Sequence, residues 1–382
     1  MPEPIERFHV RVDDPTLEDL RLRLARTRFP DQIEGTGWEY GTPIDYLREL
    51  VEYWRDEYDW RAQEAHLNRL EHFRTRLDGQ SIHFIHARSA HADALPLLLV
   101  HGWPGSIAEF LDVIPRLTNP EAHGGTAEDA FHVIAPSLPG YGFSEPPRTP
   151  GWDVRRVAQA FIQLMARLGA TRYGAQGGDW GAQITTRIAS LDPEHCAGLH
   201  LNMPIAGLPE NPGPLTNEEQ ADLATMARFQ RDEAAYAQVQ GTKPQTLGVA
   251  LNDSPAGLLS WIVEKFRTWS DCDGRPETVF TREQLITNVM LYWVTQTITS
   301  SARLYWETMH SGVLQEPLEY VGVPTGVARF PREEILRFPR SWVEQRYNVT
   351  RWVNMPRGGH FAAMEQPELF VADLRTFFRT VR

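Results

Sequence analysis

The segment Gly177-Gly178-Asp179-Trp180-Gly181 constrains the fold of this chain more than any other feature. Residues 172–176 before it have the pattern of a short strand, and residues 183–190 after it have that of a helix. A strand, a glycine-flanked turn and a helix form a nucleophile elbow, whose central residue has a strained backbone and lies above the carboxyl end of a sheet. Asp179 occupies that position, and a carboxylate there can attack an electrophilic carbon and form an ester of itself.

The order of the other elements favours a parallel α/β sheet. Two alternating runs, 73–77 and 81–87, are joined by Asp78-Gly79 and predict a hairpin. Further strands are expected at 95–101, 131–135, 172–176, 199–202, 324–330 and 350–355, and helices at 108–117, 154–168, 183–190 and 367–379.

Two segments lack this alternation. Residues 1–75 contain amphipathic helical patterns at 17–26 and 44–58, which predict an N-terminal helical extension. Residues 206–315 are helical and loop-like with many aromatic side chains, and we interpret them as an inserted helical lid. The α/β core is then divided into residues 76–205 and residues 316–382.

Length, charge and cysteine content exclude several classes of protein. The 382 residues can bury a large core and exceed the usual length of one domain. The 38 basic and 50 acidic residues give a net charge of -12, which disfavours nucleic acid as a partner. Cys196 and Cys272 form no CxxC pair and favour free thiols in a reducing compartment, although one disulfide remains an alternative.

No apolar run in the sequence is long enough to anchor the chain in a membrane. Residues 1–14 carry charges and prolines, and the longest aliphatic run, Leu97 to Val100, is far too short to span a bilayer. We therefore expect a soluble, cytoplasmic protein without a membrane anchor.

A histidine and a pair of carboxylates follow the last two predicted strands, where the partners of an elbow nucleophile are expected. A lone histidine is more often structural, but His360 follows two glycines and the terminal strand, which makes it the candidate base. Of Glu333 and Glu334 we favour Glu334 as the acid, because the apolar residues after it could anchor it inward; Glu333 keeps the shorter spacing from the strand. The acid would fix the imidazole tautomer while His360 removes a proton from water.

Backbone amides and tyrosines could stabilise the charges that form during such a reaction. His101-Gly102-Trp103-Pro104-Gly105 follows the first central strand, so the amides of Trp103 and Trp180 are the predicted oxyanion-hole donors. Tyr236 and Tyr305 in the lid could protonate a leaving alkoxide, although spacing alone favours a packing role. We expect no metal, because His83 and His86 are spaced like opposite faces of a strand and no HExxH motif occurs.

Together these motifs resemble the microsomal-type epoxide hydrolases of the α/β-hydrolase superfamily. The resemblance covers nearly the whole chain and is carried by residues 101–104, 177–181, 242–244, 250–255, 287–293 and 357–363. It implies an α/β-hydrolase fold, a mostly parallel sheet flanked by helices, with a helical lid and an N-terminal extension packed on lid and core. Membrane-bound relatives carry an N-terminal anchor that is missing here, so the chain resembles the soluble bacterial members.

The resemblance also implies a reaction that needs no cofactor and no metal. Asp179 would attack an epoxide carbon while Tyr236 and Tyr305 hydrogen-bond the epoxide oxygen. Water activated by His360 and its carboxylate would then hydrolyse the ester to a vicinal diol, with the Trp103 and Trp180 amides holding the oxyanion. The family pattern has one acid near residues 333–334, so the doubled glutamate leaves the choice between them open.

Three other functions share part of this pattern. A haloalkane dehalogenase also uses an elbow aspartate followed by tryptophan, but the lid tyrosines and the N-terminal extension argue against it. A serine esterase is disfavoured because no GxSxG occurs, and a non-catalytic ligand-binding protein on a hydrolase fold remains an alternative from another class. The tryptophan-rich lid favours an apolar aryl or alkyl epoxide as the small-molecule partner; a homodimer is compatible with the sequence. The candidate pocket walls are Trp261, Trp269, Trp293 and Trp306.

Overall fold

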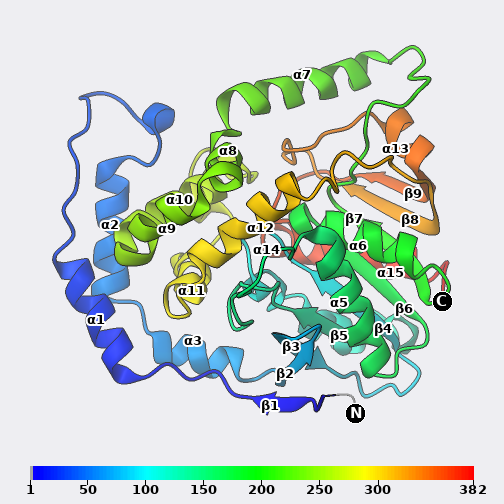
Figure 1. The fold of residues 1–382 in the computed structure, drawn as a ribbon, viewed down its shortest axis with the longest axis horizontal. Helices are drawn as coiled ribbons and strands as arrows, with labels where there is room; N and C mark the ends of the chain where they lie inside the picture. Colours follow the sequence, from blue (N-terminus) through cyan, green and yellow to red (C-terminus); the bar gives the residue numbers. More distant parts are fainter. Residues whose placement is uncertain (1–2) are drawn as a thin grey trace.

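A nine-stranded sheet forms the centre of the molecule in the computed structural model, which describes residues 3–382. The strands are ordered β1-β2-β3-β5-β4-β6-β7-β8-β9, and the run from β5 to β9 is parallel (Figure 1). The strands are β1 (Glu6–Phe8), β2 (His72–Leu77), β3 (Gln80–Ala87), β4 (Leu95–Val100), β5 (Phe131–Pro136), β6 (Tyr173–Gly177), β7 (Cys196–Leu201), β8 (Val321–Arg329) and β9 (Tyr347–Asn354). This is the mostly parallel α/β sheet that the sequence predicts.

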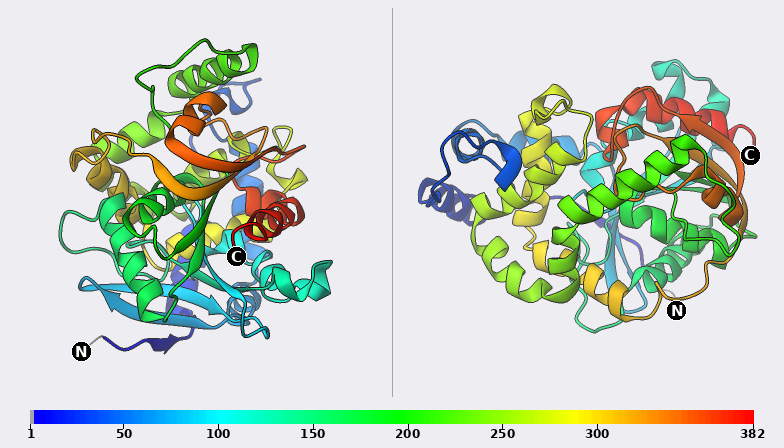
Figure 2. Two further views of the ribbon diagram at one scale, coloured as in Figure 1. Left: turned by 90° about the vertical axis from the view of Figure 1, so that its right-hand side faces the viewer. Right: turned by 90° about the horizontal axis from the view of Figure 1, so that it is seen from above.

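Helices cover both faces of the sheet, which explains why its central strands are mostly apolar and buried. Figure 2 shows α5 (Val154–Arg167) and α6 (Asp179–Leu191) on one side of the sheet and α15 (Pro367–Phe378) on the other. The close approach of α15 depends on glycine, because a Cβ at Gly326 would lie 2.7 Å from the Phe377 ring and one at Gly198 would lie 2.9 Å from the Val381 side chain. The remaining helices outside the region between β7 and β8 are α1 (Asp14–Ala25), α2 (Ile44–Asp56), α3 (Trp60–Leu67), α4 (Ile114–Thr118), α13 (Arg340–Arg346) and α14 (Ala362–Glu365).

The antiparallel edge of the sheet is partly as predicted. Asp78 and Gly79 have φ of 49° and 75° and form the tight turn between β2 and β3, which confirms the hairpin. The N-terminal segment, predicted as helical up to residue 75, also contributes the edge strand β1 and the start of β2. A three-residue strand is too short for its alternation to be recognised in the sequence.

The prediction of a single helix at residues 108–117 is wrong in detail. The structure has a 3-10 turn at Ile107–Phe110, capped by the Ser106 hydroxyl, and a separate short helix, α4. Pro115 has no N–H to donate to a carbonyl one turn earlier, so a helix that starts at residue 107 cannot continue through it. The proline instead occupies the first turn of α4, where no donor is required.

The six helices between β7 and β8 occupy the region predicted to be a lid, and we call them the helical insertion. They are α7 (Asn217–Asp232), α8 (Ala235–Thr242), α9 (Pro244–Asp253), α10 (Pro255–Thr268), α11 (Arg282–Trp293) and α12 (Ile298–His310). Helices α1 and α2 run along the outer side of α10 and α11 (Figure 1). The Tyr53 hydroxyl donates to Glu283 at 2.6 Å and the Trp54 indole contacts Met290, so the N-terminal extension is fastened to the insertion.

Two further properties of the chain bear on its environment. Across residues 3–382, the structure contains no helix with both the length and the apolarity needed to cross a bilayer. Cys196 and Cys272 are buried and free.

Candidate active site

Asp179 lies at the centre of a sharp turn between β6 and α6, as the sequence predicts. Its φ is 50°, in the left-handed region, and its side chain is 8% exposed. The turn requires small neighbours because a Cβ at Gly177 would overlap the Gly181 carbonyl, and a Cβ at Gly181 would overlap the Val100 carbonyl. The strained turn therefore holds the carboxylate at the carboxyl end of the sheet.

The loop after β4 holds one oxygen of this carboxylate. The Trp103 N–H donates to Asp179 Oδ1 at 2.8 Å. Burial raises the pKa of Asp179, whereas the His360 charge and the amides of Trp103 and Trp180 act in the opposite direction. Both amides that the sequence singles out as oxyanion-hole donors thus lie at the Asp179 carboxylate.

His101 braces this loop. Its Nε2 accepts the Leu138 N–H at 3.2 Å, and its Nδ1 donates to the Gly102 carbonyl at 3.0 Å. Burial lowers the pKa of His101 to about 4, so the ring is neutral and can make both contacts at once.

The predicted base and nucleophile are adjacent. His360 Nε2 lies 3.5 Å from Asp179 Oδ2, and His360 Nδ1 lies 2.7 Å from Glu333 Oε2. His360 and Glu333 are 6% and 4% exposed. The imidazole therefore lies between two buried carboxylates.

The prediction of Glu334 as the partner of His360 is wrong. The Glu334 carboxylate points to the surface and accepts from Arg228 at 2.6 Å. The segment after β8 makes a parallel bridge between Arg332 and Gly359, so its side chains alternate as in a strand. Arg332 points outward, Glu333 inward and Glu334 outward, which places the first glutamate against the histidine.

The charges around His360 change its acidity. Burial alone would lower the pKa of His360, but the carboxylates of Glu333, Asp179 and Glu109 outweigh it and raise the pKa to about 9. Below that pH the resting protein therefore holds an imidazolium between carboxylates. Loss of the negative charge on Asp179 would remove part of this effect and lower the pKa of His360, which makes its imidazolium a stronger acid and a better proton donor.

The two predicted tyrosines meet above Asp179, although they come from α8 and α12. Tyr236 and Tyr305 are 5% and 3% exposed, and their ring centroids are 5.9 Å apart. Trp103 stacks on Tyr236 at 5.2 Å, and Trp180 packs edge-on against Tyr305 at 4.7 Å. The pKa values of both phenols are raised, first by burial and then by neighbouring groups that include Asp179, so both hydroxyls are neutral donors.

The four candidate tryptophans lie in different environments in the structure. Trp269 is 2% exposed, and its ring centroid lies 5.1 Å from His360 and 5.0 Å from Tyr236. Trp306 is 37% exposed and stacks on a surface histidine, so its role as a pocket wall is not supported. Trp293 packs against the Arg23 guanidinium, and Trp261 donates to Gln240 at 3.2 Å.

Sequence reasoning missed one charged residue near the site. Lys265 of α10 is 7% exposed, and its Nζ lies 5.1 Å from the Tyr236 ring and 5.8 Å from the Trp269 ring. A cation over aromatic faces is stabilised by their quadrupoles. The sequence carries no distinct signal for it, because Lys265 stands between Glu264 and Arg267 in the same helix.

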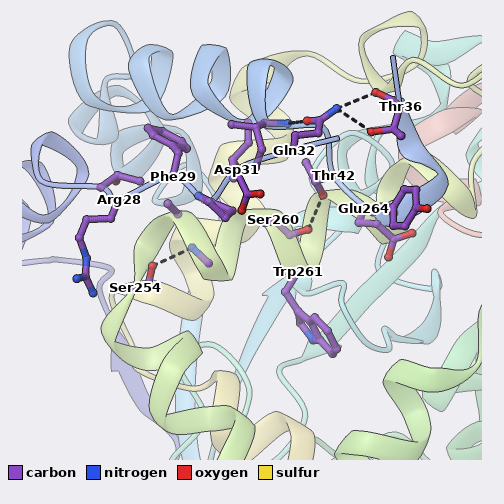
Figure 3. Close-up of a pocket in the computed structure, with 18 of the residues that line it drawn as sticks. Arg28, Phe29, Asp31, Gln32, Thr36, Thr42, Ser254, Ser260, Trp261 and Glu264 are labelled. Atoms are coloured by element: carbon purple, nitrogen blue, oxygen red, sulfur yellow. Dashed lines mark hydrogen bonds between the residues drawn. The ribbon is translucent and has the colours of Figure 1, made fainter. Parts of the chain in front are cut away.

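A surface pocket of about 600 Å³ lies between residues 27–44 and α10 (Figure 3). Phe29, Trp261 and Glu264 are among its lining residues, whereas the catalytic candidates are not. Lys265, next to Glu264 on the same helix, faces the Tyr236 ring, and its ammonium group is also ion-paired with the Glu264 carboxylate. Helix α10 therefore lies between this pocket and the residues around Asp179, and the Lys265–Glu264 pair links the two sides.

An elbow nucleophile with a histidine and carboxylate at the carboxyl ends of a parallel sheet defines an α/β-hydrolase. Residues 96–367 match the family model described as "alpha/beta hydrolase fold", and residues 5–110 match "Epoxide hydrolase N terminus".

Similarity to individual proteins identifies the family within the α/β-hydrolases. A Stigmatella aurantiaca protein provisionally named an epoxide hydrolase is 50% identical over 380 residues, covering 99% of this chain and 86% of the relative. Epoxide hydrolase 1 of Sus scrofa is 42% identical, with 98% of this chain and 88% of the relative covered. The crystal structure of juvenile hormone epoxide hydrolase from the silkworm Bombyx mori matches with a TM-score of 0.91 and 35% identity, covering 100% of this chain and 95% of that one. The chain belongs to the epoxide hydrolase family, which confirms the predicted fold class and family.

Proposed function

We propose that this protein hydrolyses an apolar epoxide to a vicinal diol through an ester of Asp179. One observation carries the proposal: Asp179 Oδ1 is held by a backbone amide at 2.8 Å, Oδ2 lies 3.5 Å from His360, and two neutral tyrosines lie nearby. The carboxylate thus has a fixed oxygen, a free oxygen and proton donors within one buried space. Cofactor and metal have no role in this proposal.

In the first step, Asp179 Oδ2 attacks an epoxide carbon and the carbon–oxygen bond of the ring breaks. The leaving alkoxide takes a proton from Tyr236 or Tyr305, which are protonated because burial raises the pKa of both. The Trp103 amide keeps Oδ1 in place, so Oδ2 is the oxygen presented to the substrate.

In the second step, water hydrolyses the ester. Esterification removes the Asp179 charge that helps to raise the pKa of His360, so the imidazolium more readily returns a proton to the tyrosinate. The neutral imidazole then takes a proton from water, while Glu333 accepts a hydrogen bond from the Nδ1–H group and so fixes the tautomer. The amides of Trp103 and Trp180 stabilise the tetrahedral oxyanion. When it collapses, the diol leaves with the former Asp179 Oδ2 as its new hydroxyl oxygen, the oxygen of water takes the place of Oδ2 in the carboxylate, and the protons of water balance the reaction.

The surroundings of the site support an apolar substrate. The rings of Trp103, Trp180 and Trp269 border the tyrosines and His360. The helical insertion supplies Tyr236, Tyr305 and Trp269, so we assign it the role of a lid. The free, buried cysteines are in keeping with a cytoplasmic location, which we include in the proposal.

Intact-protein mass spectrometry of His360→Ala tests the covalent step. Without the base, the ester should accumulate and the protein should gain the mass of the whole epoxide, because ring opening expels no fragment. An Asp179→Ala, His360→Ala double variant is the control and should gain nothing. A gain from haloalkanes alone, with halide released, would identify a dehalogenase; an adduct that persists in the double variant would remove Asp179 from the mechanism.

Tyr236→Phe and Tyr305→Phe are each expected to slow ester formation by about 10- to 100-fold, since loss of one proton donor removes general acid catalysis. The double variant should be slower than either single variant. Rapid-quench measurement of ester formation checks this expectation, with Tyr320→Phe, an exposed tyrosine, as the control. Unchanged rates in the double variant would exclude the two phenols as acids.

A further inference from the structure

A second buried carboxylate lies behind the catalytic histidine. Glu365, at the end of α14, is 7% exposed. Its Oε1 accepts the Phe361 N–H at 2.9 Å, and its Oε2 accepts the Asp271 N–H at 2.8 Å. Asp271 follows α10 in the helical insertion, so one carboxylate links the histidine loop to a segment 94 residues earlier in the chain.

The same two segments are joined by backbone contacts. The His360 N–H donates to the Trp269 carbonyl at 2.9 Å, and the Gly358 N–H donates to Asp271 Oδ2 at 2.9 Å. A Cβ at Gly359 would lie 2.5 Å from the Trp269 carbonyl oxygen, so the two backbones are in direct contact. Residues 358–361 of the core and 269–271 of the insertion therefore form one junction.

This junction connects groups that act in different steps of the reaction. The Trp269 ring packs against His360 on one side and Tyr236 on the other, at 5.1 Å and 5.0 Å. A change in the junction would move His360 relative to the ester carbonyl. A displacement of about 1 Å at a reacting group can cost about 100-fold in rate.

Glu365 suits this junction because both of its partners are N–H donors. A carboxylate supplies two acceptor oxygens, whereas an amide supplies one acceptor and one donor. Burial raises the pKa of Glu365 to about 7, and the amides of Asp271 and Phe361 act against that rise. Keeping a carboxylate at such a buried position is costly unless its two hydrogen bonds are needed.

We propose that Glu365 is a positioning residue that anchors the His360 loop to residues 269–271 and so aligns the base for ester hydrolysis. The proposal rests on the proposed function for its kinetic consequence. Ester formation uses Asp179, the Trp103 loop and the tyrosines, none of which Glu365 hydrogen-bonds. Loss of Glu365 should therefore affect the second step more than the first.

Single-turnover kinetics of Glu365→Gln test this separation. In either amide orientation one N–H donor of the protein faces the glutamine NH2, so one link of the junction is lost. We expect ester decay to slow about tenfold or more, while ester formation changes less than about twofold. The ester should accumulate, and kcat and KM should fall together because hydrolysis becomes more strongly rate-limiting.

The matched control is Glu344→Gln, which removes an exposed glutamate paired with Arg340 at 2.7 Å on α13. Both rates should remain unchanged in it. Asp271→Ala provides a second variant at a partly exposed position and removes the acceptor of the Gly358 N–H. It should also slow ester decay more than ester formation, by a smaller factor than Glu365→Gln. It decides the question if Glu365→Gln does not fold.

Imidazole NMR of His360 tests positioning independently of turnover, and thereby separates failure of this proposal from failure of the proposed function. The His360 titration should shift in Glu365→Gln and remain as in wild type in Glu344→Gln. Equal slowing of both steps, or a lower melting temperature with unchanged rates and an unchanged His360 titration, would overturn the proposal.

Discussion

Replacing Asp179 with alanine is expected to abolish diol formation, with a loss in kcat on the order of 10⁵- to 10⁶-fold, as for other nucleophiles that form a covalent intermediate. No second carboxylate can substitute, because the Trp103 amide and the strained turn fix the position of this one. Glu333 lies on the far side of the imidazole. Product formation from an apolar epoxide, followed by chromatography, measures the loss.

A folded variant is required for this result to be informative. Alanine is less suited than aspartate to a φ of 50°, so Asp179→Asn should be measured beside it, since asparagine tolerates the left-handed region. Circular dichroism and thermal unfolding should show that both variants fold. Diol formation at a near-normal rate by either folded variant would contradict the ester mechanism.

The same variants should change how stability depends on pH. In the wild type the pKa of His360 is raised to about 9, above its value in the unfolded chain, so its ion pairs contribute stability that is complete below about pH 6.5 and lost as the pH rises towards 9. Asp179 is one of the charges responsible, and its removal should move this loss to lower pH. Unfolding experiments between pH 6 and 10 measure the shift.

The parts of the site that could be predicted are those set by local sequence. The elbow is recognisable because its glycines are required by contacts within the turn and with one adjacent strand. His360 is recognisable because it follows two glycines and the last strand. The sheet was predictable because its central strands are covered on both faces and are therefore mostly apolar, with Gln176 and His200 among the exceptions.

The parts that were missed depend on contacts between distant segments. The choice between Glu333 and Glu334 is decided by the bridge from Arg332 to Gly359, which outweighs the local sign on which the sequence prediction relied, the apolar residues after Glu334. The proposed role of Glu365 depends on the hydrogen bond that it accepts from the Asp271 N–H, and Asp271 lies 94 residues earlier in the chain, in the helical insertion. Trp269 lies against His360 whereas Trp306 lies at the surface, and this difference depends on how the helices α10 and α12 pack.

The adjacent glutamates allow a stringent test of the assigned acid. Glu333→Gln is expected to lower kcat by about 10²- to 10⁴-fold, by analogy with the loss of the carboxylate from other histidine-based triads. Glu333 Oε2 lies 2.7 Å from His360 Nδ1, and its Oε1 accepts the Ile335 N–H at 3.1 Å. Glutamine cannot accept at both positions, so either the Ile335 N–H loses its acceptor or the imidazole takes the tautomer that carries its proton on Nε2 and cannot act as the base.

Glu334→Gln is the control, since it differs by one position and removes the same charge. Glu334 pairs with Arg228 at the surface, and pairs of this kind contribute about 0 to 1 kcal/mol to stability. Its kcat should stay within about twofold of wild type. Burst kinetics should show ester accumulation in Glu333→Gln alone, because this substitution impairs the base, His360, and leaves the nucleophile, Asp179, intact. The opposite pattern would restore the acid that the sequence favoured, and would mean that the Glu333–His360 contact at 2.7 Å has no part in the reaction.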